Sequence, residues 1–126
     1  MKKIILLFSL LVMGISSQAQ EVKKNKNAKI TFEVDGICGM CKKRIETAAL
    51  KTKGVKFALW DIKTHQLNLI VDERKTAITT IQKNILKVGH DVKGVKATDT
   101  AYNSLHPCCK YRDEEIVLDH EEGLKK

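Results

Sequence analysis

The stretch KITFEVDGICGMCKKRIETAALKTKG, residues 29–54, places two cysteines between two different hydrophobic patterns. Before the cysteines, apolar and polar residues alternate over residues 30–34, which is typical of a half-buried β-strand. After them, apolar residues recur at helical spacing and predict a helix over residues 41–52. The pair Cys38-x-x-Cys41 is therefore expected in a loop between the end of a strand and the start of a helix.

Residues 55–97 continue with elements of the same two kinds. Runs of β-branched and other apolar residues predict two strands, over residues 55–62 and 66–72, joined by the hairpin turn KTHQ. Apolar residues at helical spacing predict an amphipathic helix over residues 76–88, and residues 91–97 fit a weaker fourth strand. The order β-α-β-β-α-β predicts an α+β, ferredoxin-like sandwich, in which two helices cover one face of a four-stranded antiparallel sheet.

This topology predicts which loops lie together. The cysteine loop, the hairpin that contains His65 and the end of the second helix next to His90 all fall at one end of the sheet. His90 is therefore expected near Cys41, as a third ligand or as a hydrogen-bond donor to a thiolate, with an exposed loop histidine as the alternative. The fourth strand would run away from this end, so the C-terminal tail is expected to start at the opposite end.

The N-terminal residues have the pattern of a secretory signal peptide. A short basic segment, MKK, precedes a twelve-residue apolar stretch and the small and polar residues SSQAQ. We expect cleavage near Ala19 or Gln20, with an uncleaved anchor as the alternative. Cleavage predicts a periplasmic or secreted protein without stable membrane insertion. The expected organisation is a signal peptide (1–19), a polar lead-in (20–28), a central domain (29–97) and a C-terminal tail (98–126).

The charge of the chain favours a protein partner over nucleic acid. The formal net charge is +8 at pH 7, and only 5% of the residues are aromatic. These few aromatic residues do not form the ladder that would stack on bases. An exported protein also rarely meets nucleic acid. A basic surface that docks an acidic protein partner is the expectation that remains.

The chemistry of the cysteine loop predicts a soft-metal site. Thiolates are soft ligands that select Cu(I), Hg(II)-like ions and, when more ligands are available, Zn(II). Cys38 and Cys41 can approach one ion from two sides and leave room for an incoming thiolate from a partner. The helix start and the basic residues 42–44 favour the thiolate form and a negatively charged complex. Met40, between the cysteines, offers a thioether as a weak additional ligand.

With these residues in place, residues 30–97 resemble the heavy-metal-associated domain, the family of copper chaperones, periplasmic mercury-binding proteins and N-terminal modules of metal-pumping ATPases. The resemblance is carried by Cys38-x-x-Cys41 between a strand ending FEVDG and a helix, and by the following LKTKGVKFALWDIKTHQLNLIVD. It covers a little over half of the chain. One departure is that Gly36-Ile37 directly precedes Cys38, where the family usually has Gly-Met and one further residue.

The resemblance implies a non-enzymatic metal carrier, chaperone or scavenger. Its two loop cysteines would bind the ion, with Cu(I) favoured and Hg(II) or Zn(II) as alternatives. The ion would pass by thiolate exchange to or from a metal-donating or metal-accepting protein, such as a metal pump or an efflux system. The central domain, residues 29–97, would be the heavy-metal-associated domain itself.

The C-terminal tail has no counterpart in a minimal domain of this family. It places His106, Cys108 and Cys109 within four residues. These residues can form a second soft-metal site or a lid that brings sulfur to the first. A disulfide to Cys38 or Cys41, or a disordered tail with reactive thiols, remains an alternative. A bridge between the adjacent tail cysteines is disfavoured because neighbouring Cα atoms lie only ~3.8 Å apart.

Two other functions remain open at this point. A CxxC pair at a helix start is also the layout of a thiol–disulfide redox protein. Here, however, no proline lies between the cysteines, and the order of elements is not that of thioredoxin. The other alternative is a partner-binding module whose cysteines are structural. No catalytic triad, carboxylate pair or phosphate loop stands out, so no enzymatic activity is expected.

Overall fold

The computed structural model describes residues 21–126. The predicted signal peptide, residues 1–19, lies outside the described residues. Within residues 21–126, no helix combines the length and the apolar character that a membrane span requires.

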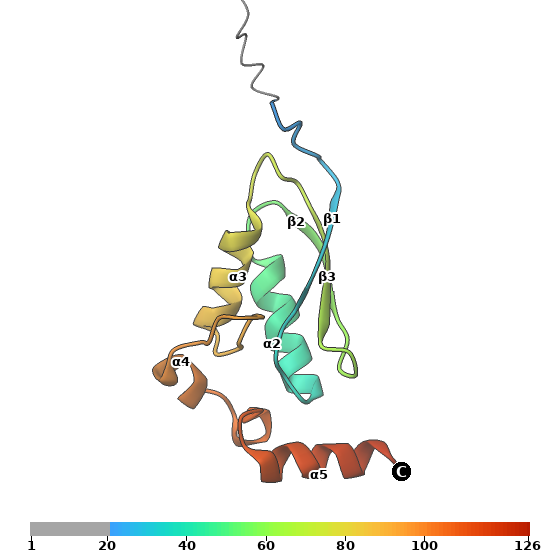
Figure 1. Cartoon of the computed structure of the whole chain (residues 1–126), viewed down its shortest axis with the longest axis vertical. Helices are drawn as coiled ribbons and strands as arrows, with labels where there is room; N and C mark the ends of the chain where they lie inside the picture. Colours follow the sequence, from blue (N-terminus) through green and yellow to red (C-terminus); the bar gives the residue numbers. More distant parts are fainter. Residues whose placement is uncertain (1–20) are drawn as a thin grey trace, which may run out of the picture.

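A small antiparallel sheet forms one layer of the fold. Its strands are β1 (Ala28–Glu33), β2 (Val55–Trp60) and β3 (Gln66–Val71), in the order β1-β3-β2. Two helices, α2 (Gly39–Leu50) and α3 (Ile78–Lys87), cover one face of this sheet (Figure 1). The α+β class is therefore as predicted, but the described sheet has three strands and not four.

The prediction of a fourth strand over residues 91–97 was wrong, because this segment turns back on itself. Val92 makes one isolated bridge with Val34 and a second with Val95, three residues further on. Gly94 between them has a φ of 80°, a conformation that glycine adopts without strain. The tight turn ends pairing with the sheet after one residue and sends the chain away from it. The tail consequently starts at the cysteine end of the sheet, and the expected start at the opposite end was wrong.

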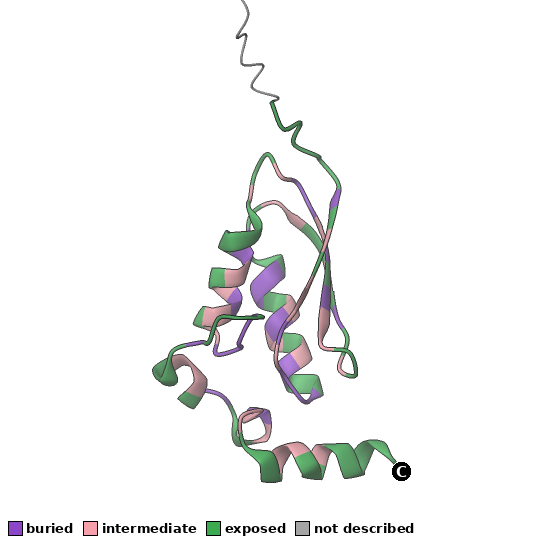
Figure 2. Cartoon of the chain, viewed as in Figure 1, coloured by how far each residue is buried: buried purple, intermediate pink, exposed green. Residues whose placement is uncertain are grey.

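The core lies between the sheet and the two helices. Trp60 is 1% exposed, and its indole Nε1–H donates a hydrogen bond to the carbonyl oxygen of Val34 at 3.0 Å. On the other face of the sheet, Phe57 and Leu59 remain exposed. Figure 2 shows the buried residues gathered where α2 and α3 face the strands. The fully buried aliphatic side chains of this core are Val34, Ile45, Leu67, Leu69, Val71, Ile81 and Ile85.

The tail folds as three short helical elements. These are α4 (Asp99–Asn103), the 3₁₀ turn η1 (Pro107–Cys109) and α5 (Glu114–Leu124). They lie below the cysteine end of the helices in Figure 1. Leu105, between α4 and η1, is 3% exposed and packs close to Gly89. A Cβ on Gly89 would lie 2.6 Å from the carbonyl oxygen of Ala101, so this close contact requires glycine.

Candidate metal centre

The cysteine loop places two thiols side by side at the start of α2. Cys38 is the N-cap residue, with extended φ and ψ, and its Sγ accepts a hydrogen bond from the backbone N–H of Cys41 at 3.4 Å. The Sγ atoms of Cys38 and Cys41 are 3.3 Å apart. Gly36 allows the loop to pack closely, because a Cβ there would lie 3.0 Å from the Cβ of Cys41 and 3.1 Å from the Trp60 ring. Ile37, the residue directly before Cys38, is 9% exposed and anchors the loop in the core.

The tail brings a third thiol to this pair. The Sγ atom of Cys109 lies 3.4 Å from that of Cys38, although 71 positions separate them in the sequence. Cys41 and Cys109 are fully buried and Cys38 is 8% exposed. All four cysteines of the chain are free. We call Cys38, Cys41 and Cys109 the inner sulfur cluster. Of the arrangements left open for the tail, the structure shows the one in which it lies over the loop and brings sulfur to it.

Three further donors lie on the solvent side of this cluster. The Sγ atom of Cys108 is 3.4 Å from Met40 Sδ and 3.2 Å from His106 Nδ1. It is also 3.9 Å from the Sγ atom of Cys109. The sulfur atoms of Cys38, Cys108 and Cys109 all lie within 4.8 Å of one another, a separation that one ion can bridge. We call Met40, His106 and Cys108 the outer donor group.

The tail is held in this position by a partly buried ion pair and an aromatic contact. The Arg112 guanidinium donates to both carboxylate oxygens of Asp91, at 2.7 and 3.2 Å. The Tyr111 hydroxyl donates to the Gly89 carbonyl oxygen at 2.8 Å and accepts from the Asp91 backbone N–H at 2.9 Å. The Tyr111 ring also stacks on His90, with centroids 5.6 Å apart. Because Tyr111 and Arg112 follow Cys109 by only two and three positions, their contacts fix the position of its thiol.

His90 packs against the tail through Tyr111 and makes no hydrogen bond to a thiol. It is fully buried, and its Nδ1–H donates to the Asp35 carbonyl oxygen at 2.8 Å. Its Nε2 has no hydrogen-bond partner. Burial lowers the pKa of His90 to about 4, so the ring is neutral at pH 7. The predicted location at the cysteine end is right, but neither ring nitrogen is hydrogen-bonded to a cysteine.

The three inner thiols differ in how readily they ionise. Burial acts to raise the pKa of Cys38, but the hydrogen bond from the Cys41 backbone N–H and the neighbouring thiols together outweigh it and lower the pKa. Burial raises the pKa of Cys41 and, more strongly, that of Cys109. Cys38 is therefore the first thiolate of the cluster. Of the basic residues 42–44, Lys42 pairs with Glu46 and the Trp60 carbonyl oxygen.

We expect Cys38 to react first among the inner thiols. The thiolate is the reactive form, and each unit of pKa changes the thiolate fraction at neutral pH by about tenfold. Reduced, metal-free protein treated briefly with iodoacetamide at pH 7 should therefore label Cys38 faster than Cys41, and at least about tenfold faster than Cys109, whose pKa is raised most strongly. Peptide mass mapping gives the three rates, with the half-exposed Cys108 as reference. Faster labelling of Cys41 than of Cys38 would contradict this order.

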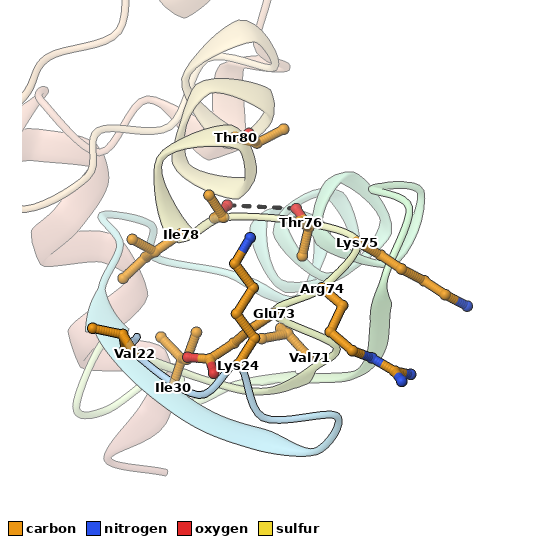
Figure 3. A pocket seen from close by; sticks show the side chains of 11 residues that line it. Val22, Lys24, Ile30, Val71, Glu73, Arg74, Lys75, Thr76, Ile78 and Thr80 are labelled. Atoms are coloured by element: carbon orange, nitrogen blue, oxygen red, sulfur yellow. Dashed lines mark hydrogen bonds between the residues drawn. The ribbon is translucent and has the colours of Figure 1, made fainter. Parts of the chain in front are cut away.

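A separate pocket lies at the other end of the sheet. It encloses about 630 Å³, between the lead-in, the end of β3 and the start of α3 (Figure 3). Its lining contains no cysteine, histidine or methionine, so it offers no soft ligand. The residues that line it are Val22, Lys24, Ile30, Val71, Glu73, Arg74, Lys75, Thr76, Ala77, Ile78 and Thr80.

Comparison with known proteins identifies the domain. Residues 31–91 match the family model of the heavy-metal-associated domain, and this part of the chain is such a domain. Domains of this family are metal-binding modules and are generally not catalytic. A search of curated proteins found no match. The family match ends at residue 91, so it does not include the tail.

Solved structures show the same fold. The CopZ metallochaperone is 29% identical, with a TM-score of 0.50, and the match covers 52% of this chain and 98% of that one. A putative copper-ion-binding protein from Bacillus anthracis is 24% identical, with a TM-score of 0.50 and coverage of 52% and 94%. The N-terminal domain of a potential copper-translocating P-type ATPase from Bacillus subtilis is 21% identical, with a TM-score of 0.50 and coverage of 52% and 84%. The last two likenesses support the fold alone.

The sequence did not predict the residues that hold the tail. Asp91 was assigned to the fourth strand, and no partner was foreseen for it. The useful signal was the pair Tyr111-Arg112, one residue after the tail cysteines, because an arginine that becomes partly buried needs an acidic partner.

Proposed function

We propose that this protein is an exported carrier or scavenger of a soft metal ion, with Cu(I) as the favoured cargo and Hg(II) or Zn(II) as alternatives. The observation that supports it is the pair of thiols of Cys38 and Cys41, 3.3 Å apart at the start of α2, in a domain of the heavy-metal-associated family. Export rests on the signal-peptide pattern of the first nineteen residues.

The chain itself supplies the ligands in a defined order. Cys38, with its lowered pKa, offers the first thiolate, and its position as the N-cap residue places the negative charge at the positive end of α2. Cys41 and Cys109 are neutral thiols in their buried positions, so binding of the ion displaces a proton from each. Cys109 would then hold the position that a partner's thiolate takes in an open two-cysteine site. This arrangement favours retention of the ion until the tail moves away or a competing thiolate replaces Cys109.

A basic surface beside the site would receive the partner. The lining of a groove of about 330 Å³ between α2 and the end of α3 includes Lys43, Arg44 and Lys51. Met40, which belongs to the outer donor group, also borders it. An acidic metal-donating or metal-accepting protein docked here would lie next to the thiols. Attraction between opposite charges would speed its association and make the rate fall with salt.

The test is metal stoichiometry and affinity measured by native mass spectrometry. Reduced protein is offered Cu(I), Hg(II) and Zn(II) in competition, and Cys38→Ser is compared with Cys108→Ser. Loss of a residue that hydrogen-bonds to a metal ligand typically lowers metal affinity 10- to 100-fold. Loss of the ligand Cys38 itself should therefore lower the affinity for the first ion by at least about 100-fold. Cys108→Ser is the matched control and should retain that ion. Unchanged affinity in Cys38→Ser would rule out the loop as the site.

A thiol–disulfide redox function is the second candidate. It is favoured by the lowered pKa of Cys38 and by the short distance from its Sγ atom to that of Cys41. Metal-free protein would then catalyse disulfide exchange in a model substrate, and Cys38→Ser would lose that turnover. Absence of turnover together with tight Cu(I) binding would exclude this candidate.

A further inference from the structure

We propose that the outer donor group is a second soft-ion position, through which an ion reaches the inner sulfur cluster. The proposal rests on the proposed function, because it assumes that the inner cluster binds the cargo. The group combines one thiol, one thioether and one imidazole around the Sγ atom of Cys108, with Met40 Sδ at 3.4 Å and His106 Nδ1 at 3.2 Å. This ligand set suits Cu(I) and is unsuited to hard ions such as Mg²⁺ or Ca²⁺.

Exposure distinguishes the two positions. The inner cluster is closed, since Cys41 and Cys109 are fully buried. In the outer group Met40 is 48% exposed, His106 is exposed and Cys108 is half-buried. An ion arriving from solvent therefore meets the outer donors before it meets the inner thiols.

A continuous series of sulfur atoms links the two positions. Cys108 Sγ is 3.9 Å from Cys109 Sγ, which is 3.4 Å from Cys38 Sγ, which is 3.3 Å from Cys41 Sγ. Each step is short enough for one ion to contact both sulfur atoms at once. The ion can thus move inward by exchanging one thiolate at a time, without returning to water.

The outer donors are held in place before an ion arrives. His106 is the N-cap residue of η1, and its Nδ1 accepts a hydrogen bond from the Cys108 backbone N–H at 3.3 Å. This bond requires a bare lone pair on Nδ1, facing Cys108, and an ion would take the place of the long cap bond. His120 donates from Nε2 to the Cys108 carbonyl oxygen at 2.9 Å and fixes the backbone of the turn. Met40 lies in the first turn of α2.

The charge of the ligands gives the movement a direction. A monovalent ion bound by the Cys108 thiolate, a thioether and a neutral imidazole forms a complex without net charge. The inner position offers up to three thiolates, which bind a soft cation more tightly than one thiolate with two neutral donors. The outer position should therefore be the weaker and faster one, and the inner position the final one.

The experiment is a titration of the reduced protein with Cu(I) alone, followed by native mass spectrometry with a competing chelator. The wild type should bind two ions in separate steps. Cys108→Ser should bind one ion. Met40→Leu and His106→Gln should each lower the affinity for the second ion by at least about tenfold and leave the affinity for the first unchanged. His65→Gln is the matched control and should bind two ions, as the wild type does. Stopped-flow uptake of the first ion should also slow in Met40→Leu, which keeps the volume of the side chain.

The outcomes separate this proposal from the proposed function. A wild type that binds one ion, with equal affinity and uptake in Cys108→Ser and Met40→Leu, would overturn the outer position and leave the inner site standing. A wild type that binds a single ion, whose affinity falls in Cys108→Ser, would overturn it as well, because all four thiols would then share one ion. A wild type that binds no soft ion would reject the proposed function itself. Circular dichroism of each variant shows that the fold is retained.

Discussion

Trp60→Ala is expected to lower the free energy of unfolding by about 3–5 kcal/mol, the usual loss when a large buried aromatic side chain is removed. The indole is 1% exposed, and its Nε1–H satisfies the carbonyl oxygen of Val34 at the end of β1. It also lies against Gly36, which packs on the first turn of α2. The substitution removes packing from the core and leaves a buried acceptor unpaired, next to the loop that carries Cys38.

Chemical denaturation followed by circular dichroism measures this loss, since Trp60 is the only tryptophan and its fluorescence disappears with it. Leu59→Ala is the matched control on the same strand. Leu59 is 46% exposed, so this variant should stay within about 0.5 kcal/mol of the wild type. Trp60→Phe should fall between the two, because it keeps a ring and loses the N–H donor. A loss below about 1 kcal/mol in Trp60→Ala would show that the loop is not built on this side chain.

Tyr111→Ala is expected to release the tail from the cysteine loop. The variant loses the stacking on His90 and the edge contact with Tyr102, whose ring centroid is 5.2 Å away. It also leaves the Gly89 carbonyl oxygen and the Asp91 backbone N–H without the hydroxyl that bonds both. Together these contacts should contribute on the order of 3 kcal/mol to docking of the tail. Opening of the tail should then become about 100-fold more frequent.

Alkylation of the Cys109 thiol, which is fully buried when the tail is docked, reports this opening. In metal-free protein at neutral pH, alkylation of Cys109 should accelerate about 100-fold in Tyr111→Ala and less in Tyr111→Phe, which keeps the ring. Leu118→Ala is the control, because Leu118 lies on α5 with 57% of its surface exposed. Hydrogen exchange should show faster opening over the tail and unchanged protection in the sheet. Equal alkylation of Cys109 in the wild type and Tyr111→Ala would mean that other contacts hold the tail.

The sequence predicted the elements whose pattern is local. The alternation in β1, the hairpin of β2 and β3 and the periodic helix α3 were all placed within a few residues of their observed bounds. The fourth strand failed because its outcome depends on distant residues. Asp91 is buried, and its carboxylate is satisfied by Arg112 and by the Ala97 backbone N–H. These contacts and the turn at Gly94 stabilise a fold-back that no local propensity indicates.

The candidate site, too, could be predicted from the sequence only in its local part. Cys38 and Cys41 could be predicted as neighbours because the spacing and the strand-to-helix loop fix their geometry. The contact between Cys38 and Cys109 could not, since it depends on the end of the sheet at which the tail begins. Because the fourth strand does not form, the tail begins at the cysteine end of the sheet and not at the opposite end. A lid over the loop was one of several arrangements that the tail sequence allowed, and only the three-dimensional contacts distinguish it from the others.

The contact between Cys38 and Cys109 joins segments that are 71 positions apart. An ion held by both would act as a reversible cross-link, which restricts the unfolded chain much as a disulfide does. Cargo that binds only the folded chain also adds to its stability in proportion to the logarithm of its concentration. A loaded protein would therefore resist heat and proteolysis better than an empty one. The amount of folded protein that escapes proteolysis would therefore rise and fall with the supply of the metal that it binds.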